Sequence, residues 1–306
     1  MGDPDLSVVI PSWNGARNLE DKLPSVLMAA RVAGDAEVVV ADDASRDDTA
    51  DLLARRFPGV RLVRRETNGG FALNANAGIA AARGRVVLLL NNDVAVRPDA
   101  AQRLLEALDV DPGTFAVVPS IVRVRSGVEE ALTRIRYRRG VVSTAIDGTP
   151  DRPPDYACGG AMAFERERFR SLGGFDPLFG PFYWEDVDLS YRARKRGGTI
   201  RFVASARVDH DHGSTIGVRF ERRRIVRVYE RNRLLFTWKN LHDRPLWRAH
   251  LALLGPKLAW DLVAHRAFVA GFADALALRR RIFAARRAER AASVVADREL
   301  LKTPQA

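Results

Sequence analysis

The chain has 306 residues, of which 47% are hydrophobic and 28% charged, a balance typical of a globular protein with a sizeable core. Its single cysteine, Cys158, excludes an internal disulfide, no uncharged apolar run approaches the ~20 residues of a membrane span, and no secretory signal begins the chain, so we expect a cytoplasmic protein. The net charge of +11 arises in residues 219–306, where 20 basic and 8 acidic residues leave +12, and this asymmetry indicates an anionic partner, either nucleic acid or an acidic membrane surface.

The first ninety residues alternate apolar runs with helical patterns. We predict four strands, at residues 6–11, 37–41, 60–64 and 85–90. Helices are expected between them, at residues 18–32, from about 48 to 57, and at 68–83. This alternation predicts crossover units and a parallel sheet that is buried on both faces.

Polar side chains follow three of these predicted strands at the point where each strand ends. They are Trp13 and Asn14, then Asp42 and Asp43, then Asn91, Asn92 and Asp93. In an open α/β sheet, ligands bind outside the carboxyl ends of the strands. We therefore expect these three groups to face one crevice.

The second third of the chain is less regular. Residues 126–155, which carry five arginines and three prolines, are predicted to form a loop or hairpin over the crevice. A short helix is expected at 165–171 and a last strand at 200–205, and the pattern is helical from about residue 219. Between them lies an aromatic stretch that ends in Trp184, Glu185 and Asp186.

Several segments, taken in chain order, resemble the family 2 glycosyltransferases over roughly residues 6–240. They are Ser7–Asn14 (SVVIPSWN), Val40–Ser45 (VADDAS), Asn68–Phe71 (NGGF), Leu88–Val94 (LLLNNDV), Gly173–Asp176 (GGFD), Trp184–Leu189 (WEDVDL) and His210 with Gly213 and Thr215. The resemblance implies a GT-A-type nucleotide-binding mixed sheet flanked by helices, over residues 1–218, followed by a basic amphipathic helical segment, 219–306. It also implies transfer of a hexosyl unit, with inversion, from a nucleotide-diphosphate sugar to a saccharide or lipid-linked acceptor in cell-surface polysaccharide synthesis. The asparagine-rich metal motif is most similar to rhamnosyltransferase-like members, which suggests a rhamnosyl unit.

The resemblance places the catalytic base at Asp186. Direct displacement at an anomeric carbon needs one base to take the proton of the acceptor hydroxyl. Glu185 beside it and the apolar walls formed by Phe182, Tyr183 and Trp184 would raise the pKa of this base toward neutral pH. The alternative is that these acids simply occupy the first turn of a helix, where the helix dipole favours them.

The resemblance also implies a divalent cation, Mg²⁺ or Mn²⁺, held by Asp93 beside the diphosphate. This chain keeps a single carboxylate where the family's motif often has two, and an Asx turn at the end of the strand is the alternative. His210 and His212 are two residues apart, so in an extended segment both would point to the same side and could complete the metal site. A structural role for these histidines is the alternative.

Thirteen further residues are expected to bind substrate: Pro11, Trp13, Asn14, Asp42, Asp43, Asn68, Gly69, Asn74, Asn91, Asn92, Gly160, Trp184 and Glu185. Asp42 or Asp43 would contact the base and ribose of the nucleotide, although aspartates also favour turns and helix caps. Trp184 would stack on an acceptor sugar, with core packing as the alternative.

The C-terminal segment has two interpretations. Five apolar residues recur at helical spacing (Trp247, Leu251, Leu254, Leu258 and Leu262), while Lys257, Asp261 and His265 line another face. Basic amphipathic helices lie at anionic membrane interfaces, so we expect peripheral attachment to the inner face of the plasma membrane. Packing of these helices on the catalytic domain is the alternative, and the segment is also a candidate for self-association.

Two other classes of protein are disfavoured. A dinucleotide-dependent oxidoreductase would carry a Gly-x-Gly-x-x-Gly turn after the first strand, where this chain has Pro11–Ala16. A nucleic-acid-binding protein would explain the basic C-terminal segment, but the chain carries no recognition-module signature, so no nucleic-acid partner is expected. A protein that binds nucleotide sugars or nucleic acid without catalysis is the remaining alternative, and Asp93 and Asp186 argue against it.

Overall fold

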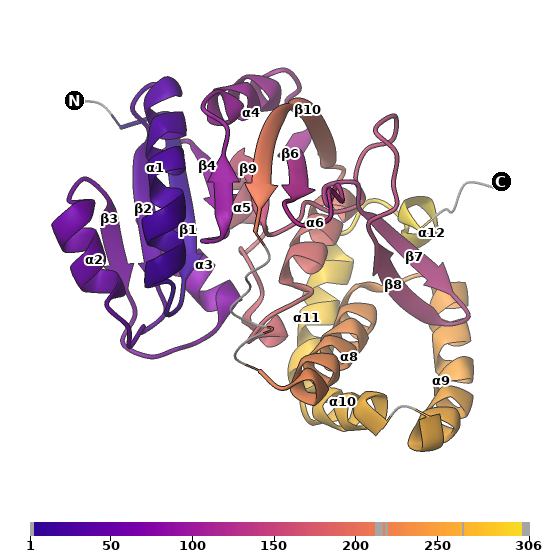
Figure 1. The fold of residues 1–306 in the computed structure, drawn as a ribbon. Coiled ribbons are helices and arrows are strands. Elements are labelled where there is room, and N and C mark those ends of the chain that lie inside the picture. Colours follow the sequence, from indigo (N-terminus) through magenta and orange to yellow (C-terminus); the bar gives the residue numbers. More distant parts are fainter. Residues whose placement is uncertain (1–2, 212–216, 218–219, 265, 302–306) are drawn as a thin grey trace.

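The computed structural model describes residues 3–211, 217, 220–264 and 266–301, and it contains one eight-stranded sheet and a two-stranded hairpin (Figure 1). The strands of the sheet are β1 (Leu6–Ser12), β2 (Glu37–Asp42), β3 (Arg61–Arg64), β4 (Val86–Leu90), β5 (Val94–Val96), β6 (Thr114–Arg123), β9 (Ala161–Glu165) and β10 (Thr199–His210). The hairpin consists of β7 (Arg134–Arg138) and β8 (Val141–Ala145), which lie within the segment predicted to form a loop or hairpin.

The strand order is β3-β2-β1-β4-β9-β6-β10-β5. The first four strands in this order pair in parallel, as predicted. The sheet is mixed because β9 runs antiparallel to both β4 and β6, and β5 runs antiparallel to β10. β10 is longer than the predicted strand at 200–205 and includes His210 as its last residue. The carboxyl ends of β1, β2 and β4 therefore meet at one edge of the sheet.

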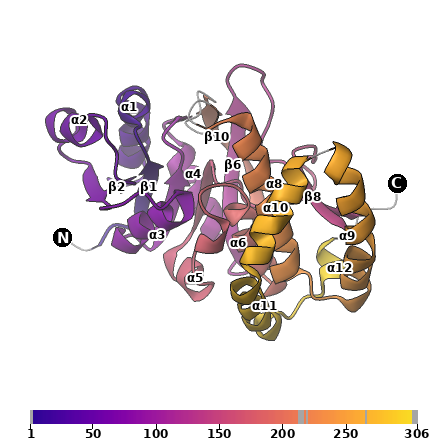
Figure 2. The same ribbon diagram turned by 90° about the horizontal axis from the view of Figure 1, so that it is seen from below.

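Helices cover both faces of the sheet, which explains why β1 and β4 are buried along their whole length. On one side lie α1 (Ala16–Val32), α2 (Thr49–Arg56) and α4 (Ala100–Asp109), and on the other lie α3 (Phe71–Ala81) and α5 (Arg166–Ser171) (Figures 1 and 2). In α1 the buried residues recur every three or four positions, as an amphipathic helix requires.

The remaining helices form a second lobe. They are the 3-10 turn η1 (Pro177–Phe179) and the α-helices α6 (Glu185–Lys195), α8 (Arg222–Asn240), α9 (Arg244–Ala264), α10 (Arg266–Ala277), α11 (Arg279–Ala292) and α12 (Asp297–Leu300). Within the part of the chain that the structure describes, no helix is long and apolar enough to cross a bilayer.

The boundary predicted at residue 218 divides the chain by composition, but the second hydrophobic core draws residues from both sides of it. Phe179 and Tyr191 from the first segment pack in this core with Phe236 from α8. At its margin, Lys239 of α8 pairs with Asp188 of α6, with the charged atoms 2.9 Å apart. The C-terminal helices are therefore part of the support of α6.

Candidate active site

Side-chain hydrogen bonds join the ends of the three parallel strands into one polar surface. The backbone N–H of Asn14 donates to Oγ of Ser45 at 2.7 Å, and Oδ1 of Asn14 accepts from the backbone N–H of Arg46 at 2.7 Å. Asn92 donates through Nδ2 to Oγ of Ser12 at 2.9 Å. The crevice predicted from the strand ends is therefore present, and its floor is built from contacts between β1, β2 and β4.

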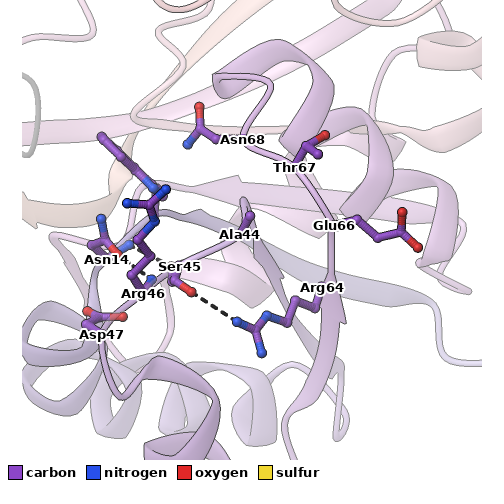
Figure 3. Close-up of a pocket in the computed structure, with 10 residues that line it drawn as sticks. Asn14, Ala44, Ser45, Arg46, Asp47, Arg64, Glu66, Thr67 and Asn68 are labelled. Atoms are coloured by element: carbon purple, nitrogen blue, oxygen red, sulfur yellow. Dashed lines mark hydrogen bonds between the residues drawn. The ribbon is translucent and has the colours of Figure 1, made fainter.

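A wide cavity of about 980 Å³ opens over β1, β2 and β3 (Figure 3). Arg46 and Arg64 bring two guanidinium groups to it, and Arg64 is fixed by donating to the carbonyl of Ser45 at 3.0 Å. The residues that line it are Trp13, Asn14, Ala44, Ser45, Arg46, Asp47, Arg64, Glu66, Thr67 and Asn68. An aromatic side chain, amides and cations together suit a planar base attached to phosphates.

The two aspartates at the end of β2 have different surroundings. Asp42 is fully buried, accepts from the backbone N–H of Ser45 at 3.2 Å and lies 3.4 Å from Arg64, so it does not line this cavity. Asp43 accepts from the backbone N–H groups of Gly69 and Gly70 at 3.0 and 2.8 Å. Asp43 therefore fixes the glycine loop before α3. Asp43, and not Asp42, also lines a second, neighbouring cavity.

A second cavity of about 430 Å³ lies deeper, between the ends of β4 and β9 and the start of α6, and Trp13 and Asn68 line both cavities. Nine of the residues predicted to bind substrate line it: Pro11, Trp13, Asp43, Asn68, Asn74, Asn91, Asn92, Gly160 and Glu185. Asp186, Asp93 and His210 line the same cavity. The candidate base and the candidate metal ligands therefore face one space, next to the wide cavity.

Asp186 stands at the first turn of α6 and is half-buried. Its Oδ2 accepts from the backbone N–H of Gly159 at 2.9 Å, and its Oδ1 accepts from that of Val187 at 2.7 Å. Burial raises the pKa of Asp186 although these hydrogen bonds act in the opposite direction. A carboxylate held in a fixed orientation, with its pKa raised toward neutral pH, suits a general base.

Glu185 lies beside Asp186 and is almost fully buried. Burial, and then the charge of Asp186, raise the pKa of Glu185 well above its usual value. Its Oε2 is buried and has no hydrogen-bond partner among the described residues, although the side chain lines the cavity. The raised pKa favours the protonated form of Glu185, and a protonated carboxyl is able to donate a hydrogen bond to a ligand.

The candidate metal site is a chain of buried charged side chains. Nε2 of His210 lies 3.2 Å from Oδ1 of Asp93, and its Nδ1 lies 2.7 Å from Oε2 of Glu130. Arg123 in turn holds Oε1 of Glu130 at 2.6 Å. Burial would lower the pKa of His210, but the hydrogen bonds to Asp93 and Glu130 outweigh it and raise that pKa to about 9.

Asp93 and His210 fit a shared divalent cation. Two adjacent ligands of an octahedral ion with bonds near 2.1 Å stand about 3 Å apart, close to the 3.2 Å between these two atoms. No group of three or more His, Cys, Asp or Glu residues among those described could hold a metal by itself. The remaining ligands would have to come from water or from a bound phosphate. His212 lies outside the described residues.

The loop before α6 is held in a strained conformation. Tyr183 and Trp184 have φ angles of 72° and 77°, in the left-handed region that non-glycine residues rarely adopt. Asn232 of α8 holds this loop, because its Nδ2 lies 2.6, 3.0 and 2.8 Å from the carbonyl oxygens of Phe179, Phe182 and Tyr183. A residue of the C-terminal segment thus determines the shape of one wall of the cavity.

Trp184 requires a correction. The predicted stacking on an acceptor sugar does not fit its position, because Trp184 is 2% exposed and packs against Tyr229 and Phe236 in the second core. Its left-handed backbone turns the indole away from the cavity that its neighbours Phe182 and Tyr183 line. Tyr183, which is 37% exposed, is the aromatic side chain of this loop that a sugar can reach.

The lining residues that sequence reasoning did not predict include Arg123, Glu130, Ile146 and Phe220. Glu130 and Ile146 come from the segment without a periodic pattern, and no motif marks them. Gly69 and Asp42, which were predicted to touch substrate, line neither of these two cavities and act through Asp43 and Ser45 instead. Asn14 lines the wide cavity but not the deeper one.

Comparison with known proteins identifies the relatives of this chain. The model of the family described as Glycosyl transferase family 2 matches residues 7–173, more than half of the chain. The succinoglycan biosynthesis protein ExoO of Rhizobium meliloti is 39% identical over 115 residues, which cover 37% of this chain and 32% of that protein. The N-acetylglucosaminyl-diphospho-decaprenol L-rhamnosyltransferase of Mycobacterium tuberculosis is 27% identical over 242 residues, covering 69% of this chain and 78% of that protein.

Among solved structures, GalNAc-T7 with UDP, GalNAc and Mn²⁺ superimposes with a TM-score of 0.61 and 20% identity, over 86% of this chain and 58% of that one. This likeness shows that the fold is the GT-A fold. The matched part of the chain spans about a third of the length of the succinoglycan protein.

Proposed function

The chain belongs to the family 2 glycosyltransferases, and on this basis we propose that it transfers a hexosyl unit, with inversion, from a nucleotide-diphosphate sugar to a saccharide or lipid-linked acceptor in the synthesis of a cell-surface polysaccharide. The observation that carries the proposal is the shared cavity. Asp186 lines it together with Asp93 and His210, and it adjoins the wide cavity over β1–β3.

The donor would lie across both cavities. The nucleoside would occupy the wide cavity, where Trp13 offers a ring face and Arg46 and Arg64 offer positive charge. The diphosphate would then reach Asp93 and His210, whose two converging atoms would hold a Mg²⁺ or Mn²⁺ ion. Such an ion, when bound, neutralises the charge that develops on the leaving nucleoside diphosphate.

Asp186 would act as the base. As the acceptor oxygen forms its bond to the anomeric carbon, its proton passes to a carboxylate oxygen of Asp186, and the bond to the diphosphate breaks on the opposite face. The two backbone N–H groups on Asp186 hold the carboxylate in place for this step. Burial favours the protonated form of Glu185, which would donate a hydrogen bond to a hydroxyl of either sugar.

A rhamnosyl unit from a deoxythymidine-diphosphate donor and a lipid-linked saccharide acceptor are the specific substrates we favour. The asparagine-rich segment Asn91–Asp93 and the similarity to the mycobacterial rhamnosyltransferase both support this choice. An acceptor of this kind lies at a membrane, so we also propose that the protein works as a peripheral protein at the inner face of the plasma membrane.

A thermal-shift panel of nucleoside diphosphates and nucleotide sugars, with Mn²⁺, with Mg²⁺ and with chelator, tests the donor site. A ligand that binds the folded state alone raises the apparent stability, by about 2.7 kcal/mol at a hundred times its Kd. We expect one nucleotide to raise the melting temperature, and a divalent cation to increase that rise. No shift with any donor, from protein shown to be folded, would overturn the proposal.

A further inference from the structure

Helix α9 presents an apolar face outward. Leu251, Trp260, Leu262 and Val263 are 50%, 72%, 59% and 89% exposed. On a helix of 3.6 residues per turn, Leu251, Leu262 and Val263 share one side with Ala252 and Ala259, and Trp260 stands at its margin. We name these six residues the α9 outer face. Exposed apolar residues gathered on one element mark an interaction surface.

Lys257 and Asp261 of α9 point away from the α9 outer face. Asp261 is 1% exposed, and its Oδ2 pairs with Nζ of Lys257 at 2.6 Å, while Lys257 stands 4.2 Å over the ring of Phe268 in α10. The face predicted to be polar is therefore the inner one. Trp247, Leu254 and Leu258 pack inward as well, and of the five apolar residues noted in the sequence only Leu251 and Leu262 are exposed. His265 lies outside the described residues.

Arginines lie at both ends of the α9 outer face. Arg248 and Arg244 occupy the same side of the helix, about one and two turns respectively before Leu251 and Ala252, and both are exposed. Arg266, exposed at the first position of α10, follows the other end. No acidic residue belongs to the α9 outer face, because the one acid of the helix, Asp261, is buried beneath it.

From this arrangement we propose that the α9 outer face docks on an anionic lipid surface, with Trp260, Leu262 and Val263 entering the headgroup region and the flanking arginines contacting lipid phosphates. The occupant is a membrane rather than a second copy because of charge complementarity. An identical face offers the arginines no carboxylate, whereas an anionic leaflet offers many. Tryptophan at the margin and arginine at the ends are typical of interfacial helices.

The position of α9 fits this role. In both views α9 lies at the end of the molecule remote from β1–β3, over which the wide cavity opens (Figures 1 and 2). Docking through α9 would leave that cavity open to soluble donor. The proposal deepens the membrane association proposed above and concerns a surface that contains none of the residues assigned to catalysis.

The test is flotation of the full chain with vesicles of phosphatidylglycerol and phosphatidylethanolamine, and with vesicles of phosphatidylcholine alone. We expect binding to the anionic vesicles, and a loss of about tenfold or more in partitioning for the double variant Trp260→Ser/Val263→Ser. Arg244→Gln/Arg248→Gln should lower the anionic binding by about fivefold per arginine and flatten its salt dependence.

Matched control variants distinguish binding through the α9 outer face from nonspecific binding of exposed apolar or basic residues to vesicles. Val110→Ser removes a valine that is 70% exposed at the end of α4, and Arg31→Gln/Arg55→Gln removes two exposed arginines from α1 and α2. Both should bind vesicles as the parent does. All of these variants should keep the parent's melting temperature, because the replaced side chains are exposed.

The outcomes that overturn the proposal are specific. Absence of anionic binding by the parent, or unchanged binding by Trp260→Ser/Val263→Ser, would remove the membrane role. Sedimentation velocity without lipid supplies a further check. If the parent is a dimer and the double variant is a monomer, the face belongs to a second copy of the chain. The thermal-shift panel is independent of these results, so a failed donor site and a failed docking face are distinguishable.

Discussion

Asn232 offers a direct test of whether the C-terminal helices shape the active site. Its side chain is fully buried, and Nδ2 reaches three backbone carbonyls of the loop that precedes α6. An amide has two N–H groups, so Asn232→Ala removes the two hydrogen bonds that Nδ2 donates, one of them shared, and leaves buried acceptors unpaired. It also removes the bond that Oδ1 accepts from Nε of Arg231 at 2.9 Å. At about 1 kcal/mol for each net bond and 1 kcal/mol or more for an unpaired carbonyl, we expect a loss of about 2–4 kcal/mol in the free energy of unfolding.

The same change should alter function beyond its effect on stability. Tyr183 and Trp184 keep their left-handed backbone against strain because the loop is held, and release of the loop displaces the wall formed by Phe182 and Tyr183. We expect kcat/KM for transfer to fall more than tenfold at a temperature where the variant is folded. Donor nucleotide should still produce a thermal shift, because the wide cavity lies on other elements.

Two further variants make this test decisive. Asn232→Asp keeps the volume but replaces donors with acceptors that face three carbonyl oxygens, so it should cost at least as much as Asn232→Ala. Thr237→Val, further along α8, removes a buried hydroxyl that donates to the carbonyl of Arg233 within its own helix and should cost less than about 1 kcal/mol. Urea unfolding measures all three, and a cost below 1 kcal/mol for both Asn232 variants would refute the reasoning.

Three other predictions concern the cavity itself. Asp186→Asn should abolish transfer, measured as release of nucleoside diphosphate with acceptor present. The affinity for donor, measured by thermal shift, should stay within a few-fold of the parent's. Retained turnover would remove Asp186 from the role of base. Glu130→Gln takes away the anionic partner of His210 Nδ1, so we expect a 10- to 100-fold weaker Mn²⁺ response in a metal titration, whereas Glu129→Gln beside it serves as the control for the loop. The pKa of Glu185 is higher in the folded state than in the unfolded state. Its contribution to the free energy of unfolding is therefore fully present below about pH 4.5 and is lost as the pH rises through the raised folded-state pKa. Glu185→Gln cannot ionise, so its melting temperature relative to the parent should increase from pH 5 to pH 9, and parallel pH profiles would contradict the assignment.

The sequence alone determined where the polar groups of the crevice would lie. Trp13 and Asn14, Asp43, and Asn91–Asp93 each follow a short apolar run, and such runs separated by helices pair in parallel with their ends together. These are local signals, because period, length and turn residues depend on neighbours in the chain. Asp186 was identified instead through the resemblance of Trp184–Leu189 to a family motif, because the consecutive acids by themselves indicate only a helix start.

Only the tertiary structure decided which of several local options each side chain takes. Glu130 meets His210 across 80 positions of sequence, and Asn232 meets Tyr183 across 49, so no local pattern could pair them. Trp184 and Tyr183 are adjacent aromatics, yet the left-handed turn sends one into the core and leaves the other at the cavity.

Helix α9 shows the physical reason most clearly. Helical period groups Leu251 with Leu262 and Lys257 with Asp261, but it does not say which group faces inward. That choice depends on the surface the helix packs against, here Phe268 of α10, which accepts the Lys257 ammonium over its ring and leaves the apolar side of α9 exposed. Periodicity is a property of the segment, whereas burial is a property of the segment together with its distant partners.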